Sequence, residues 1–267
     1  MIICHISDIH VFLYKRHQEY LEVFENLYNS LKKDNVELIV ICGDLFHSKT
    51  VLSPESIRIT RDFLIRLSNI SDVIIIPGNH DLSVSNSERL NSISPIVESI
   101  IPKHKIFFFT ESTLFQYKDF VFGIFNMLQK EKYPIEISEP SIKSKIKIAL
   151  YHGMIKNSTN DLGFKFDNGD SIDIFKHYDI AMLGDIHKYQ ELSKNIIYSG
   201  SLLQHDVSES NTKGYVLWNV DSKNISHTFI EVKNRYGYFT VKCQDKIFPD
   251  SICEIENITP NATVRIL

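Results

Sequence analysis

The sequence has few cysteines, and no two of them have the spacing of a metal or redox motif. The four are Cys4, Cys42, Cys243 and Cys253, and no Cys-x-x-Cys pair occurs. This argues against a cysteine-bound zinc site. Cys4 and Cys42 fall within apolar runs, where a thiol acts as a small apolar side chain. We therefore expect reduced, structural cysteines, as in intracellular proteins.

An excess of positive charge is also missing. Lys and Arg number 29 against 33 Asp and Glu, which gives a net charge of -4. Proteins that hold nucleic acid by bulk electrostatics are basic, so this composition argues against a DNA-coating protein. It is compatible with a nuclease, because bound divalent ions would supply positive charge where phosphate binds.

Long apolar runs are absent as well. No run approaches the ~20 residues that span a bilayer. The sequence opens with a strand-like run at residues 2–6 and has no charged segment followed by an apolar one, so we expect no signal peptide. These features predict a protein without membrane contact that is not secreted and lies in the cytoplasm or nucleus.

The first part of the sequence alternates between two apolar patterns. Helical spacing predicts helices at residues 17–33, 54–70 and 90–101, and β-branched apolar runs predict strands at 2–6, 36–42 and 73–76. Ser53 before Pro54 is a helix start signal. With 267 residues, of which 43% are hydrophobic, the chain can form one large domain plus an appendage. The alternation predicts an α/β domain with a partly parallel sheet.

The second part is rich in strands. We predict them at residues 106–109, 114–117, 120–125, 146–151, 180–183, 196–198, 215–220, 228–232 and 262–267. Residues 172–177 have the pattern of a short helix, and the polar segment 128–144 reads as a loop or an insertion. Helices followed by strands predict two sheets packed face to face, with helices outside.

Polar side chains follow the predicted strands at the points where the strands end. These residues are Asp8, His10, Asp44, Asn79, His80, Asp81, His152, Asp185 and His187. In open α/β sheets, ligands bind beyond the carboxyl ends of the strands, so we expect these side chains to converge. His5 lies inside a strand instead, and we expect it in the core.

The donors in this set are carboxylates, imidazoles and one amide, with no thiolate. Such donors suit manganese, iron(II), zinc or magnesium. They are too many for one tetrahedral ion and about right for two ions ~3.5–4 Å apart that share a carboxylate. One Asp-x-His or Gly-Asp alone is usually a turn, so the prediction depends on the motifs occurring together.

In their order, these motifs resemble the calcineurin-like metallophosphoesterase superfamily over about residues 1–232. They are Asp8-x-His10, Gly43-Asp44, Gly78-Asn79-His80-Asp81, His152-Gly153 and Gly184-x-x-His187. The segments 43–47, 53–56, 199–204 and 213–215 are similar to the SbcD-type nucleases of double-strand break repair. The resemblance implies two packed mixed β-sheets flanked by helices, a four-layer α-β-β-α domain at residues 1–232. Residues 233–267 would begin a DNA-capping domain. That domain would be incomplete here, either because the chain is truncated or because the protein is naturally short.

The resemblance also implies a role for each motif residue. Metal one would be bound by Asp8, His10 and His187, and metal two by Asn79, His152 and Asp185, with Asp44 bridging. The family more often has His where Asp185 stands. His80 would act as the catalytic histidine, oriented by Asp81. His47 would either contact DNA near the cleft or pack behind the site.

The implied activity is hydrolysis of DNA phosphodiester bonds by a hydroxide activated by two metal ions. The family includes manganese-dependent 3′→5′ exonucleases with endonuclease activity in DNA repair or recombination, and Mg²⁺, Fe²⁺ or Zn²⁺ are alternative ions. A partner would be an SMC-like coiled-coil ATPase, whose docking segment would lie beyond the end of this sequence; a homodimer is another option. Two alternatives stay open: a phosphodiesterase of the same superfamily for small molecules, and a non-catalytic scaffold.

Overall fold

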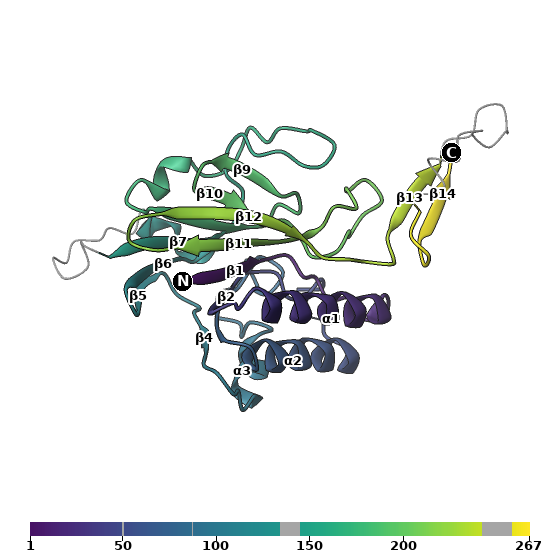
Figure 1. Ribbon diagram of the computed structural model, residues 1–267, viewed down its shortest axis with the longest axis horizontal. Helices are drawn as coiled ribbons and strands as arrows, with labels where there is room; N and C mark the ends of the chain where they lie inside the picture. Colours follow the sequence, from purple (N-terminus) through teal and green to yellow (C-terminus); the bar gives the residue numbers. More distant parts are fainter. Residues whose placement is uncertain (50, 87, 134–144, 242–257) are drawn as a thin grey trace.

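Two six-stranded β-sheets form the body of the protein and pack face to face (Figure 1). The computed structural model describes residues 1–49, 51–86, 88–133, 145–241 and 258–267. Strands β2 and β3 of one sheet lie over β7 and β8 of the other. The prediction of two mixed sheets flanked by helices is confirmed.

The first sheet combines strands from both ends of the chain. Its order is β12-β11-β1-β2-β3-β4, with β1 to β4 parallel and β11 and β12 antiparallel. The strands are β1 (Ile2–Ile6), β2 (Leu38–Cys42), β3 (Asp72–Ile76), β4 (Ile106–Phe108), β11 (Gly214–Val220) and β12 (Ile225–Glu231). Because β11 pairs with β1, the segment just before β11 is carried toward the end of β1.

The second sheet has a parallel centre between antiparallel edge strands. Its order is β5-β6-β7-β8-β10-β9. The strands are β5 (Thr113–Tyr117), β6 (Phe120–Phe125), β7 (Ile146–His152), β8 (Ile180–Gly184), β9 (Gln190–Ser193) and β10 (Ile196–Tyr198). The polar strand β9 was not predicted, because its four residues show no clear alternation.

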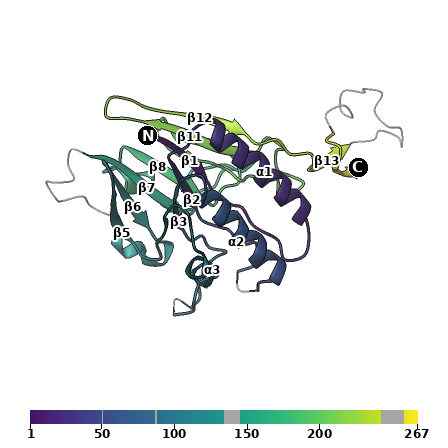
Figure 2. The ribbon, with the colours of Figure 1, turned by 60° about the horizontal axis from the view of Figure 1, so that its bottom comes forward.

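Side chains of the central strands alternate between two cores. In β2, Leu38 and Val40 face the second sheet, whereas Ile39 and Ile41 face the helices. Helices α1 (His17–Lys33) and α2 (Pro54–Ser68) cover the face of the first sheet from which Ile39 and Ile41 project (Figure 2). Buried on both faces, such strands read as continuous apolar runs in the sequence.

Helix α2 begins where the sequence predicts it. The Ser53 hydroxyl accepts a hydrogen bond from the backbone of Ser56, and the Ser56 hydroxyl accepts one from the backbone of Ser53. Pro54 lacks the N–H that would be unpaired in the first turn. Two local signals therefore agree at this helix start.

The outer face of the second sheet is covered differently. In the described part of the chain its covering layer consists of loops and 3₁₀ turns, η1 (Met127–Lys132) and η3 (Ile172–Phe175). The predicted loop at 128–144 is therefore wrong at its start, where the Asn126 side chain caps the first turn of η1 through the N–H of Leu128. Residues 134–144 of that prediction lie outside the described residues.

The predicted helix at residues 90–101 is much shorter in the structure. Helix α3 spans only Ser94–Ser99. The Asn91 side chain accepts hydrogen bonds from the N–H groups of Ile93 and Ser94, so it closes a turn where a helix was expected. Ile100 is already extended, which ends the helix before the predicted boundary.

The C-terminal segment forms a separate two-stranded sheet away from the body (Figure 1). Strands β13 (Tyr238–Val241) and β14 (Thr263–Ile266) pair in parallel. The Gln204 side chain joins this sheet to the body, donating to the carbonyl of Tyr238 and accepting from its N–H. The predicted strand at 262–267 corresponds to β14.

The cysteines of the described segments behave as expected. Cys4 and Cys42 are free and buried, and burial raises the pKa of both thiols. Cys243 and Cys253 lie outside the described residues. In the described segments, no helix combines the length and apolar character needed to cross a bilayer.

Candidate metal centre

The loops that follow β1 and β2 continue side by side beyond the sheet. The N–H of Asp8 donates to the carbonyl of Gly43 at 3.1 Å, and the N–H of His10 donates to the carbonyl of Asp44 at 3.0 Å. Asp8, His10 and Asp44 all have positive φ angles, of 53°, 49° and 57°. Such angles are strained for residues with side chains, and strain of this kind concentrates at functional sites.

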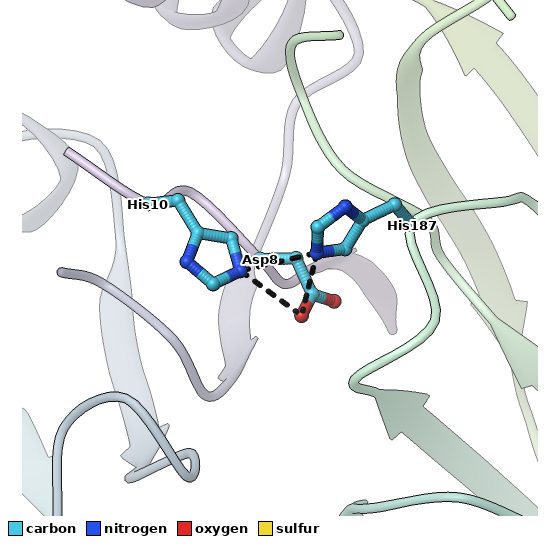
Figure 3. A group of neighbouring side chains, drawn as sticks. All are labelled: Asp8, His10 and His187. Atoms are coloured by element: carbon cyan, nitrogen blue, oxygen red, sulfur yellow. Dashed lines mark hydrogen bonds and ion pairs between the residues drawn. The ribbon is translucent and has the colours of Figure 1, made fainter. Parts of the chain in front are cut away.

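Asp8, His10 and His187 form one group of converging donors, shown in Figure 3. The Nε2 atoms of His10 and His187 are 3.1 Å apart, and they lie 3.9 and 4.0 Å from Oδ1 of Asp8. Two ligand atoms at ~2.1 Å from a tetrahedral cation are ~3.4 Å apart, so the two imidazoles lie at ligand spacing and Oδ1 of Asp8 lies slightly beyond it. We call this group position one.

Asp44 lies between two sets of ligands. Its Oδ2 is 3.3 Å from Nε2 of His10, and its Oδ1 is 3.4 Å from Nε2 of His152. Each carboxylate oxygen thus faces a histidine from a different strand end. This is the arrangement that a carboxylate shared by two cations requires.

His152, Asn79 and Asp185 complete a second group, which we call position two. Oδ1 of Asp185 is 3.7 Å from Nε2 of His152 and 3.4 Å from the side-chain nitrogen of Asn79. Nε2 of His152 and Oδ1 of Asn79 are buried without a hydrogen-bond partner among the described residues. Nδ1 of His152 donates to the carbonyl of Cys42 at 2.7 Å, so Nε2 is the ring nitrogen that faces Asp44 and Asp185.

These donors fit a pair of divalent cations. Asp8 and Asp44 are buried, and unpaired buried acceptors and charges are costly. Burial raises the pKa of the Asp8 carboxyl to about 6. Burial acts in the same direction on Asp44, but the charges and hydrogen bonds of His152 and His80 together outweigh it and lower the pKa of Asp44. Cations here would satisfy both the orphaned atoms and the carboxylates.

His80 lies beside position one, and its ring is held by a backbone carbonyl. Nδ1 of His80 donates to the carbonyl of His47 at 2.6 Å, and the N–H of His80 donates to Oδ1 of Asp44 at 2.8 Å. Nε2 of His80 is therefore the nitrogen available to a substrate. The ring of His47 packs on Phe12, with ring centroids 4.0 Å apart.

Asp81 is buried beneath these loops. Its carboxylate accepts hydrogen bonds from the N–H groups of Leu45, Phe46 and Gly78. Burial and the charge of Asp44 raise the pKa of Asp81 to about 7. Asp81 thus ties the loop after β2 to the loop after β3, whereas the ring of His80, which Asp81 was expected to orient, has the His47 carbonyl as its partner.

Comparison with known proteins identifies the family. The profile of the Calcineurin-like phosphoesterase family matches residues 1–189. The chain belongs to this family. The resemblance inferred from the strand-end motifs is therefore confirmed, and the chain is a phosphoesterase by family.

Two relatives of this phosphoesterase differ in the share of their own length that aligns with this chain. An uncharacterised protein of Acanthamoeba polyphaga mimivirus is 40% identical over 259 residues, which cover 91% of this chain but 19% of that protein. The chain thus spans about a fifth of the length of this relative. The SbcD component of the nuclease SbcCD from Staphylococcus epidermidis is 27% identical over 320 aligned positions, which cover 98% of this chain and 84% of that protein.

A solved structure supports the fold of the phosphoesterase. It is described as GAP50, the anchor in the inner membrane complex of Plasmodium. It matches with a TM-score of 0.52 and 11% identity, over 98% of this chain and 96% of that one. At this identity the match concerns the fold alone.

Three residues that support the phosphoesterase site were not predicted as site residues. Glu209 accepts from Nδ1 of His187 at 2.7 Å and pairs with Lys213 at 2.9 Å. His205 donates to the carbonyl of Asp8 at 3.0 Å. Burial opposes ionisation of Glu209, but the hydrogen bond from His187 and the charge of Lys213 hold its pKa well below the usual value. His205 and Glu209 lie in the connection between β10 and β11, where no strand end marks them in the sequence.

The close approach of two loops requires glycine at position 78. A Cβ atom on Gly78 would overlap Oδ1 and the backbone nitrogen of Asp44. Gly78→Ala should therefore displace Asp44, lower the free energy of unfolding by ~1–3 kcal/mol and reduce the metal bound per chain. Elemental analysis and thermal denaturation measure both effects.

Gly163→Ala is the matched control for this substitution. A Cβ there meets nothing within 4 Å, while the φ of +80° imposes a backbone cost without touching the site. The control should bind metal as the unmodified protein does. Equal metal content in the Gly78 and Gly163 variants would contradict the packing argument.

Proposed function

We propose that this phosphoesterase is a divalent-metal-dependent nuclease that hydrolyses phosphodiester bonds in DNA. The observation that carries the proposal is the position of Asp44. Its two oxygens face His10 and His152, and its Oδ1 accepts the N–H of His80. A shared carboxylate beside a histidine with a free ring nitrogen is what in-line hydrolysis of a phosphoester requires.

The proposed roles follow from the contacts of each residue. Metal one is assigned to Asp8, His10 and His187, metal two to Asn79, His152 and Asp185, and Asp44 to both. Bound divalent cations lower the pKa of water and neutralise charge on the phosphate. His80 is assigned to donate a proton from Nε2 to the leaving oxygen, with its ring oriented by the His47 carbonyl. Asp81 is assigned to hold the loops that carry Asp44 and Asn79.

The choice of DNA over a small phosphodiester rests on the similarity to the SbcD component of the nuclease SbcCD, which extends over 98% of this chain. A cavity of about 200 Å³ lies beside the proposed ligands and is lined by Asp185, His187 and Lys188.

Several finer features are proposed on the resemblance to SbcD-type nucleases. They are manganese as the working ion, 3′→5′ exonuclease and endonuclease activity, a role in DNA repair or recombination, and an SMC-like coiled-coil ATPase as partner. Residues 233–267 are proposed as part of a DNA-capping unit. The guanidinium of Arg16 lies 5.1 Å from the centre of the Tyr238 ring, which links the first loop of the site to this unit.

The experiment compares the rates of hydrolysis of several substrates, measured at one concentration of Mn²⁺ and, separately, at one concentration of Mg²⁺. Linear DNA with blunt, overhanging or hairpin ends is tested against bis-p-nitrophenyl phosphate and cyclic nucleotides. Cleavage of DNA with a higher kcat/KM than the small diesters supports the nuclease. Hydrolysis of cyclic nucleotides alone would assign the chain to small phosphodiesters, and hydrolysis of none of the substrates by metal-loaded protein would indicate a scaffold.

A further inference from the structure

The two positions of the metal centre differ in the chemistry of their donors. Position one has the imidazoles of His10 and His187 beside the carboxylate of Asp8. Position two has a single imidazole, from His152, beside the amide oxygen of Asn79 and the carboxylate of Asp185. With Asp44 shared, position one offers equal numbers of nitrogen and oxygen donors, and position two is dominated by oxygen.

The groups behind the histidines increase this difference. Nδ1 of His187 donates to the carboxylate of Glu209 at 2.7 Å, and the same carboxylate pairs with the Lys213 ammonium at 2.9 Å. Nδ1 of His152 donates to the neutral carbonyl of Cys42. A carboxylate partner raises the basicity of an imidazole ligand more than a carbonyl does. Position one therefore has more nitrogen donors, and one of them, His187, has a carboxylate behind it, whereas Nδ1 of His10 has no hydrogen-bond partner among the described residues.

Nitrogen and oxygen donors select different ions. Imidazole suits zinc, iron and other borderline cations, which bind it more strongly than manganese does, whereas carboxylate and amide oxygens suit magnesium and manganese. Asp185 is the residue that decides this balance at position two. A histidine there would give both positions the same two nitrogens and two oxygens.

We propose that the centre is built for two unlike ions, a tightly held borderline cation at position one and an exchangeable hard cation, Mg²⁺ or Mn²⁺, at position two. Asp185 is the specificity-determining residue for the second ion, and Glu209 is the positioning residue for the first. This inference rests on the two-metal centre of the proposed function and adds that its halves are not equivalent.

The backbone allows Asp185 to be exchanged without loss of the fold. The φ of Asp185 is 96°, a region in which Asp, Asn and His are all enriched. Its contact with Asp8 is made by the backbone N–H, at 3.1 Å from each carboxylate oxygen. Asp185→His and Asp185→Asn should therefore keep this contact and change only the donor at position two.

The test loads metal-free full-length protein with Zn²⁺ and Mn²⁺ together and measures both by elemental analysis. The unmodified protein should bind one of each, and its electron paramagnetic resonance spectrum should show an isolated Mn²⁺. Asp185→His should bind zinc at both positions and lose the manganese signal. Asp185→Asn keeps an oxygen donor and should retain the mixed loading.

Glu209→Gln tests the other half of the proposal. It should weaken zinc binding at position one by ~10–100-fold and leave manganese binding at position two unchanged. The inference is overturned if the unmodified protein binds two zinc ions, if Asp185→His leaves the zinc to manganese ratio unchanged, or if Glu209→Gln weakens both positions equally. Mixed loading without DNA cleavage would leave the inference standing and remove the nuclease.

Discussion

Asp44→Ala should lower the metal content and remove the activity. The substitution deletes the oxygens that face His10 and His152, so neither position keeps its full set of donors. A bound metal contributes several kcal/mol to the stabilisation of a transition state, and each ~1.4 kcal/mol corresponds to a tenfold change in rate. We expect the metal content to fall from two ions to one or none, and DNA hydrolysis to fall by ~10³-fold or more.

Two further substitutions make the Asp44 result interpretable. Asp44→Asn keeps an acceptor for the N–H of His80, at 2.8 Å from Oδ1 in the structure, and removes the charge. It should fold as well as the unmodified protein and still lose metal. Asp62→Ala removes a half-exposed carboxylate on α2 and should bind two ions. Two ions per chain in Asp44→Ala, measured by elemental analysis, would rule out the bridging role.

His80→Asn should separate catalysis from metal binding. Asparagine cannot donate the proton that Nε2 of His80 is proposed to give, whereas the assigned metal ligands are untouched. General acid catalysis is worth ~10²–10⁴-fold, and we expect kcat for DNA to fall by that factor. Metal content and melting temperature should stay at their unmodified values.

A comparison of leaving groups tests the assignment of the proton. p-Nitrophenolate leaves without protonation, so hydrolysis of bis-p-nitrophenyl phosphate should be reduced far less than hydrolysis of DNA. His177→Asn alters a histidine that is exposed, and both rates should be unchanged. Equal losses on the two substrates would assign His80 to binding or to electrostatic stabilisation. DNA turnover at the unmodified rate would exclude His80 from the mechanism.

Helices and strands were predicted accurately where the residues that cause them lie within or next to the element itself. β1 and α1 have the predicted bounds, and α2 begins at Pro54 as predicted, because apolar spacing and the Ser53 cap lie within each segment. Only the part of the predicted helix 90–101 that spans Ser94–Ser99 forms, since the Asn91 side chain closes a turn at the start of the predicted range. Strand β9 was missed because pairing with β10 defines it, rather than its own residues.

The site shows the same division. Asp8, Asp44 and His152 could be selected from the sequence because each stands at the end of a strand, and the ends of parallel strands meet at one edge. His205 and Glu209 have no such local mark. They reach the site because β11 pairs antiparallel with β1, which brings the preceding connection to the loop that carries Asp8.

The order of motifs alone indicated the phosphoesterase family and singled out the side chains that we propose as metal ligands, since donor type and strand position are properties of the chain itself. Only the tertiary structure decided how those donors are used. Three contacts show this: Asp44 lies between His10 and His152, the carbonyl of His47 holds the ring of His80, and Asp81 accepts backbone N–H groups. Each of them joins segments that lie tens to more than a hundred residues apart in the sequence. Contacts of that kind are set by how the two sheets pack, which no local pattern records.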